Sequence, residues 1–249
     1  MALVNREDDG KGLCTLTLNR PEKYNALNSE LFAELDAHLA RLEQETGRIG
    51  CVVLRGAGKA FCAGADLAAA QAGTSAQLGV DKPGVITRLQ NLPQPVIAAV
   101  HGLCYTGGLE LALAADFILA SSAAHFADTH GKWGFVGGWG MTQRLPRRIG
   151  PAQAKRLMMT AHVIGAGEAA AIGLVDICVG EPDFELVLSS FVADILANSW
   201  FTNRETKRIL RDSDGLSLRE GLAHEKVHHP GSAPDWRERV AGFGNRRNG

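Results

Sequence analysis

Hydrophobic and polar residues follow two different spacings along the first half of the chain. Residues 12–18 largely alternate apolar and polar side chains, which predicts a half-buried strand. Residues 29–43 place leucines at helical spacing, and Asn28 or Ser29 is suited to cap that helix. Apolar runs predict buried strands over three further segments, residues 51–54, 95–100 and 117–120. Strands that alternate with helices indicate an α/β fold with parallel pairing.

The pattern changes in the second half, where strands nearly disappear. One more strand is predicted over residues 175–179, and helices are predicted over 184–195 and 201–242. No Pro/Ser-rich linker and no repeat divides the chain. We therefore expect an α/β core over residues 1–180 and a helical C-terminal region over 181–249, docked on the core or on a partner subunit.

Charge and composition exclude several classes of protein. Lys and Arg number 26 against 27 Asp and Glu, so electrostatic attraction to nucleic acid or to an anionic membrane is not expected. No stretch has the apolar character of a membrane span, and the start lacks the pattern of a secretory signal. The five cysteines are widely spaced, without a C-x-x-C pair. We therefore expect a soluble protein of a reducing compartment, the cytoplasm.

A segment rich in glycine and alanine, residues 55–66, directly follows a predicted strand. Small residues leave the backbone uncovered, so amide groups can approach a ligand closely. The segment matches neither a dinucleotide-binding loop nor a phosphate-binding loop, because it lacks a glycine that each of these motifs requires. Taken alone, the segment fits an ordinary tight turn as well as it fits a binding loop.

A second segment, residues 101–115, predicts a helix that begins near Gly107 and carries Glu110 in its first turn. The amides of a first turn have no partner within the helix, so they would stabilise an oxyanion there. A carboxylate beside such an anion site is the pairing needed to move a proton next to a carbonyl. The alternative is that Glu110 merely complements the helix dipole.

A third segment, residues 126–145, holds two tryptophans, a histidine and an aspartate among many glycines. Taken alone, it predicts a surface loop. Together, however, the three segments resemble the enoyl-CoA hydratase/isomerase (crotonase) superfamily over roughly residues 10–245. The motifs that carry the resemblance are LNRPEKYNALN (18–28), FCAGADL (61–67), GGLELA (107–112), WGMTQRL (139–145) and AAAIGLV (169–175).

The resemblance implies a spiral of ββα turns with a helical C-terminal region that builds trimers, often paired into hexamers. It implies an acyl-CoA substrate, with CoA entering as part of the thioester and with no metal or redox cofactor. The amides of Ala63 and Gly107 would form the oxyanion hole, and Glu110 would be the general base or acid. CoA would be contacted by Lys23, Lys59, Ala63, Gly64, Ala65, Asp66, Gly107 and Phe243.

The hydratases of this superfamily use a second glutamate, and this chain has His130 at that position. Syn addition of water to a 2-enoyl-CoA needs a base for the water and an acid for Cα. A histidine can act as either, but it cannot supply a second negative charge. Asp128 lies two residues away and could supply one.

Three interpretations of His130 stay open. It replaces the glutamate in an enoyl-CoA hydratase, or it is a bystander in a Δ3,Δ2-enoyl-CoA isomerase that uses Glu110 alone. Because the family's isomerases often keep their single glutamate at the second position, the isomerase is the weaker of these two. In the third interpretation the pocket serves another thioester reaction or little catalysis. We predict a hydratase.

Two other classes of protein are alternatives to an acyl-CoA enzyme. The sequence His224-Glu-Lys-Val-His228 fits the H-E-x-x-H signature of zinc proteases, with Glu225 to activate a metal-bound water. The pattern is short, however, and the helix ends at His229-Pro230. The other rival is a non-catalytic acyl-CoA binder, which would have no evident use for Glu110 beside an anion site.

Overall fold

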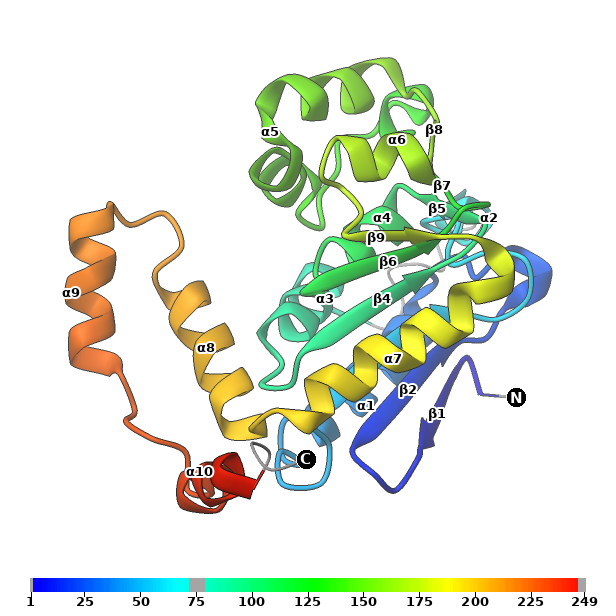
Figure 1. The fold of residues 1–249 in the computed structure, drawn as a ribbon. Helices are drawn as coiled ribbons and strands as arrows, with labels where there is room; N and C mark the ends of the chain where they lie inside the picture. Colours follow the sequence, from blue (N-terminus) through cyan, green and yellow to red (C-terminus); the bar gives the residue numbers. More distant parts are fainter. Residues whose placement is uncertain (1, 72–78, 246–249) are drawn as a thin grey trace.

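Six strands form the large sheet at the centre of the fold (Figure 1). The computed structural model describes residues 2–71 and 79–245. In spatial order the sheet contains β1 (Val4–Asp8), β2 (Leu13–Leu18), β3 (Cys51–Gly56), β4 (Val96–Val100), β6 (Phe117–Ser121) and β9 (Ile177–Val179). A second sheet contains β5 (Leu103–Tyr105), β7 (His125–Ala127) and β8 (Ile164–Gly165).

All five strands predicted from the hydrophobic pattern are present in the large sheet. They form the parallel pairs β2–β3, β3–β4, β4–β6 and β6–β9, as expected for an α/β fold. The pattern does not predict β1, which pairs antiparallel with β2. Only Val4 of this edge strand is buried, so its sequence shows no apolar alternation. The strands β5, β7 and β8 are too short to show a period.

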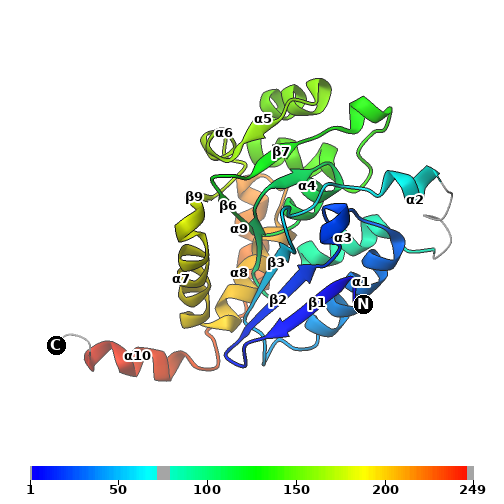
Figure 2. The same ribbon diagram turned by 90° about the vertical axis from the view of Figure 1, so that its right-hand side faces the viewer.

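Helices cover both faces of the large sheet (Figures 1 and 2). On β3, Val52 and Leu54 belong to the apolar cluster that includes α1 (Ser29–Leu42) and α3 (Lys82–Asn91). The alternate residues Cys51 and Val53 pack with α7 (Phe184–Ala197). The side chain of Asn28 accepts a hydrogen bond from the Leu31 amide, which confirms it as the N-cap of α1.

The remaining helices connect or extend this core. They are α2 (Leu67–Gln71), α4 (Gly107–Ala112), α5 (Met141–Thr160), α6 (Ala166–Ala171), α8 (Trp200–Asp212), α9 (Leu218–His228) and α10 (Trp236–Asn245). Short 3-10 helices in the described segments are η1 (Pro21–Lys23), η3 (His130–Trp133) and η4 (Glu181–Asp183).

Residues 126–145, which alone predict a surface loop, are anchored at both ends. Phe126 of β7 and Met141, the first residue of α5, are completely buried. Between these anchors, residues 131–136 are exposed, as the prediction of a loop implies. The sequence does not reveal these two buried ends, because glycines interrupt the segment and neither a helical nor a strand period extends across it.

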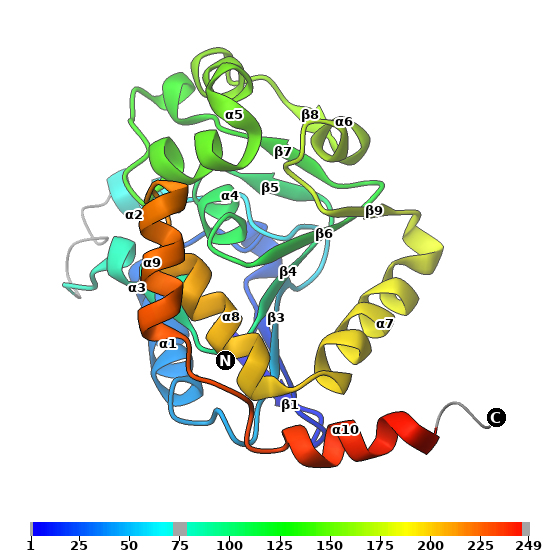
Figure 3. The same cartoon turned by 60° about the vertical axis from the view of Figure 1, so that its left-hand side comes forward.

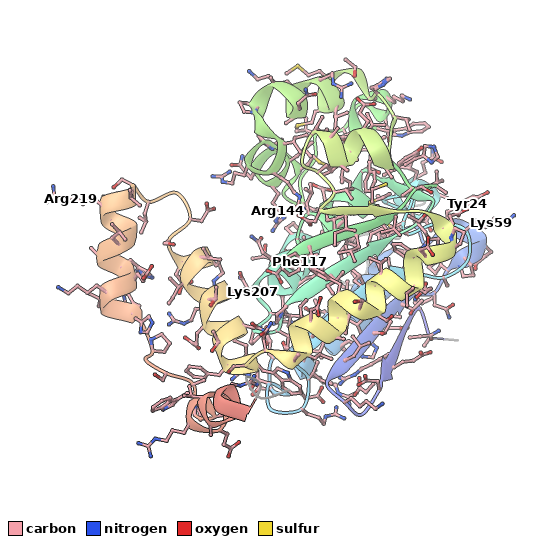
Figure 4. All side chains as sticks on the ribbon, viewed as in Figure 1. Tyr24, Lys59, Phe117, Arg144, Lys207 and Arg219 are labelled. Atoms are coloured by element: carbon pink, nitrogen blue, oxygen red, sulfur yellow. The ribbon has the colours of Figure 1, made fainter. Side chains whose placement is uncertain are left out.

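The C-terminal helices α8–α10 extend away from the sheet (Figures 1 and 3). No residue of α8 or α9 is buried within the chain. Lys207 attaches α8 to the core: its Nζ lies 2.6 Å from Asp116 Oδ2 and 2.9 Å from the Gln94 carbonyl oxygen (Figure 4). Among the described residues, no single helix is long and apolar enough to cross a membrane. The α7 and α8 segments, bent by 96°, pass that test only as a pair, by length and composition.

Replacing Lys207 with Met should weaken the attachment of α8, because it leaves the Asp116 carboxylate without its cation. We expect the free energy of unfolding in urea to fall by about 2 kcal/mol, below the roughly 3–5 kcal/mol of a fully buried pair. The smaller value reflects the 26% exposure of the Asp116 side chain. Arg55, whose partner Glu185 is 64% exposed, is the control: Arg55→Ala should cost under about 1 kcal/mol. Equal losses would contradict this account.

Candidate active site

Glu110 lies in α4, which begins at Gly107 as predicted, and its side chain is completely buried. Its Oε1 accepts hydrogen bonds from the amides of Trp139 at 2.8 Å and Met141 at 3.0 Å. These two donors fix the carboxylate from the turn that precedes α5. A residue that only complemented a helix dipole would not need to be buried and clamped in this way.

The second oxygen of Glu110 has no such donor. Its Oε2 is buried and accepts no hydrogen bond from the described residues. The His130 ring lies beside it, with Nε2 3.8 Å away. Burial raises the pKa of Glu110 above its ordinary value of 4.5, although the two amide donors oppose that shift. The group is therefore a stronger base than an exposed glutamate.

His130 is held by Asp128, whose side-chain orientation cannot be read from the sequence. Asp128 is 2% exposed, and its Oδ1 lies 2.6 Å from His130 Nδ1 and 3.1 Å from the His130 amide. This contact turns Nε2 toward Glu110. The hydrogen bond to Asp128 is the main reason that the pKa of His130 rises above 6.5. The histidine thus holds its proton to higher pH than an isolated imidazole, and the Asp128 carboxylate lies against the ring.

The predicted oxyanion hole requires a correction at Ala63. Its amide donates to the Tyr24 carbonyl oxygen at 2.9 Å, so it is not available to a ligand. The amides of Ala65 and Gly107 donate to no atom in the part of the chain that the structure describes. The letters of the motif do not show that the Ala63 amide is already bonded to the chain at Tyr24.

The two segments that carry these amides are fastened together. The Cys62 amide donates to the Leu103 carbonyl oxygen at 2.9 Å, and the Tyr105 amide donates to the Cys62 carbonyl oxygen at 3.0 Å. Gly64 is required there, because its φ is +100° and a Cβ would lie 1.9 Å from Thr106 Oγ1. Thr106 itself has a φ of +46°, which is strained for a residue with a side chain. This strained backbone directly precedes the Gly107 amide.

A cavity of about 630 Å³ lies beside Glu110, His130 and the loop that carries Ala65. Its lining includes Ala63, Ala65, Asp66, Glu110, His130 and Trp139. The Asp66 carboxylate fastens the loop instead of facing a ligand: it pairs with Arg20 at 2.9 Å and accepts a bond from the Ala69 amide. Lys82 and Lys132 also line the cavity.

Other predicted contacts lie outside this cavity. Lys23 and Lys59 are exposed and do not line it (Figure 4 labels Lys59). The side chain of Phe243 lies outside the described residues. Trp139 and Met141, which act through backbone amides, were not singled out from the sequence. A backbone contact leaves no signal in residue type.

The alternative zinc site has two histidines but no third ligand in the part of the chain described. The rings of His224 and His228 pack with centroids 4.2 Å apart on α9. No group of three His, Cys, Asp or Glu side chains among the described residues could hold a metal ion. The H-E-x-x-H pattern is thus not assembled into a metal centre by the described part of this chain.

The contact between Asp128 and His130 can be tested without any substrate. In Asp128→Asn the pKa of His130, followed by NMR of its ring protons, should fall back toward 6.5, because the main cause of the upward shift is removed. The ring-proton signals of His125, which is exposed on β7, serve as an internal reference for the measurement. A His130 pKa that does not move would show that Asp128 has no hold on the ring.

Comparison with known proteins agrees with this geometry. The family model for enoyl-CoA hydratase/isomerase matches residues 8–248. The chain is 37% identical to the putative enoyl-CoA hydratase/isomerase YngF of Bacillus subtilis, covering 94% of this chain and 92% of that protein. It is 34% identical to the short-chain-enoyl-CoA hydratase of Clostridium acetobutylicum, covering 88% and 85%.

The fold is similar as well. The crystal structure of an enoyl-CoA hydratase from Bacillus anthracis matches with a TM-score of 0.91 and 31% identity, covering 98% of this chain and 97% of that one. The resemblance stated from five sequence motifs is therefore confirmed, together with the crotonase fold that it implies. The chain belongs to the enoyl-CoA hydratase/isomerase family of enzymes.

Proposed function

We propose that this enzyme is an enoyl-CoA hydratase, which adds water to a 2-enoyl-CoA on one face of the double bond. The observation that carries the proposal is the placement of His130 Nε2 at 3.8 Å from the unbonded Oε2 of Glu110. Hydration needs a base and an acid at one place, and these two groups meet at the wall of one cavity. The naming of relatives as hydratases supports the same reaction.

The charges of the site support a hydratase that lacks the second glutamate. Asp128, protonated His130 and Glu110 together carry one negative charge and one acidic proton. One ionised and one protonated glutamate would carry the same charge and the same proton. His130 with Asp128 therefore substitutes for a protonated carboxyl group, and the 2.6 Å contact between them makes the substitution possible.

The proposed reaction begins at the thioester. Its oxygen accepts hydrogen bonds from the amides of Ala65 and Gly107 as negative charge develops. Glu110 Oε2 takes a proton from water while the water oxygen bonds to Cβ, and the electrons of the double bond move to the thioester oxygen. His130 then gives its Nε2 proton to Cα, the carbonyl re-forms, and the proton on Glu110 returns to His130.

The substrate brings CoA with it, and water is the second reactant, so this reaction consumes no metal or redox cofactor. We propose that the loop from Ala63 to Asp66 supports the CoA moiety. The exposed lysines Lys23 and Lys59 would meet its phosphates outside the cavity. Lys23 directly precedes Tyr24, whose carbonyl oxygen accepts a hydrogen bond from the Ala63 amide, and this contact supports a position beside the loop.

We also propose an assembly and a location. The C-terminal helices would join copies of the chain into a homotrimer or a hexamer. Large apolar side chains on α9 and α10 support this, since Leu218 is 80%, Val227 75% and Val240 60% exposed. We propose the cytoplasm as the location, which is supported by five cysteines that are all free.

A Δ3,Δ2-enoyl-CoA isomerase is the second candidate. One observation favours it: Glu110 has one anchored oxygen and one unbonded oxygen, so it could carry a proton between Cα and Cγ without help. In that enzyme His130 would not be needed. The buried Asp128 that orients His130 favours the hydratase instead.

Substitution of the two groups separates these candidates. Glu110→Gln should lower kcat by at least about 10²-fold on any substrate, because the base is lost while the amide contacts remain possible. His130→Ala should lower hydration of a 2-enoyl-CoA by about 10²-fold. Mass spectrometry detects the gain of water, and chromatography detects conversion of 3-enoyl to 2-enoyl thioesters. Full hydration by His130→Ala would eliminate the proposed acid, and isomerisation without hydration would establish the second candidate.

The pH dependence of kcat/KM provides a separate test. Glu110 must be ionised, so activity should fall as pH decreases through a pKa that lies above 4.5. His130 must be protonated, so activity should fall as pH increases through a pKa that lies above 6.5. Asp128→Asn should move the alkaline limb to lower pH and leave the acidic limb nearly in place. An alkaline limb that stays fixed would assign it to another group.

A further inference from the structure

The side chain of Trp139 forms a rigid wall of the cavity beside Glu110 and His130. Its ring meets Phe32 edge to face, with centroids 5.1 Å apart and an angle of 81°. The same ring lies against Gly107, where a Cβ would be 2.4 Å from Trp139 Cζ3. The indole thus occupies the space next to the helix start that carries a proposed oxyanion donor.

The backbone of Trp139 is fixed as firmly as its ring. Its amide donates to Glu110 at 2.8 Å, and its carbonyl oxygen accepts from Arg144 Nη1 at 2.7 Å. Arg144 is itself held by Gln90 of α3, through Nε at 2.9 Å (Figure 4 labels Arg144). Between them, Gly140 has a φ of +115°, and a Cβ there would meet the Arg144 guanidinium at 1.8 Å. The backbone that carries the indole is therefore held on both sides, while Phe32 and Gly107 pack against the ring itself.

Three further apolar side chains line the same cavity from the neighbouring loop. Trp133 is 59%, Phe135 54% and Val136 83% exposed. Exposed aromatic surface gains free energy when an apolar group covers it. Together with Trp139 they give the cavity that Glu110 and His130 line an apolar wall with exposed aromatic surface.

From this arrangement we propose that Trp139 is a specificity-determining residue that favours enoyl thioesters with a flat conjugated or aromatic group on Cβ. The proposal rests on the proposed function, since it assumes an enoyl thioester in this cavity. A fixed flat wall stacks best on a flat group, and an aromatic pair contributes about 0.5–1.5 kcal/mol beyond the area that it buries. A flexible alkyl chain gains less, because its rotatable bonds must be ordered against the wall.

The test compares kcat/KM for trans-cinnamoyl-CoA and crotonyl-CoA in the wild type and in Trp139→Leu. Leucine keeps the backbone amide that holds Glu110, and a loss common to both substrates cancels in the ratio. We expect the ratio of cinnamoyl to crotonyl to fall by about 3- to 10-fold. Trp236→Leu, which removes an exposed indole on α10 that does not line the cavity, should leave the ratio unchanged. An unchanged or larger ratio in Trp139→Leu overturns the proposal.

Binding of unreactive thioesters distinguishes failure of this inference from failure of the proposed function. If the wild type hydrates neither substrate, the hydratase is wrong, and the affinities for 3-phenylpropionyl-CoA and butyryl-CoA still test the wall. Trp139→Leu should then weaken the phenyl compound by about 3- to 10-fold more than butyryl-CoA. Equal weakening overturns the proposal in that case too. A preference for glutaryl-CoA over both would also overturn it and assign specificity to Lys82 or Lys132, which line the same cavity.

Discussion

The site depends on one buried carboxylate and the two amides that hold it. Glu110 is buried, and within the described part of the chain only its Oε1 accepts hydrogen bonds. Leaving a buried oxygen without a partner typically costs about 1–3 kcal/mol. The chain accepts that cost at Oε2, which faces the cavity and His130. A fully satisfied carboxylate would be more stable and a poorer base, so the missing bond supports the proposed role of Glu110 as the base.

The turn before α5 serves the site through its backbone as much as through its side chains. The amides of Trp139 and Met141 clamp Glu110, while the Trp139 carbonyl is clamped in turn by Arg144. Because one peptide segment contacts the base and lines the cavity, reactivity and shape are coupled there. A substitution that loosens this turn would change both together, which is why the comparison of two substrates is more informative than a single rate.

The sequence predicted the scaffold well and the hydrogen-bond directions poorly. Apolar runs and apolar–polar alternation predicted the five strands that pair in parallel, because buried strand faces leave a clear pattern. Leucines at helical spacing predicted the capped helix α1. The hydrophobic pattern missed β1, whose side chains are mostly exposed. Motifs identified the loop around Ala65 but selected Ala63, because residue letters do not record that the Ala63 amide is already bonded to the Tyr24 carbonyl oxygen.

Asp128 shows the same limit at the chemistry itself. Its distance from His130 in the sequence is two residues, which leaves its direction undetermined until β7 and η3 fix the backbone. Once they do, Asp128 is buried and bonded to the ring. That hydrogen bond is the main cause that raises the pKa of His130 above 6.5. The proposed acid role of His130 therefore depends on Asp128 as well as on the histidine itself.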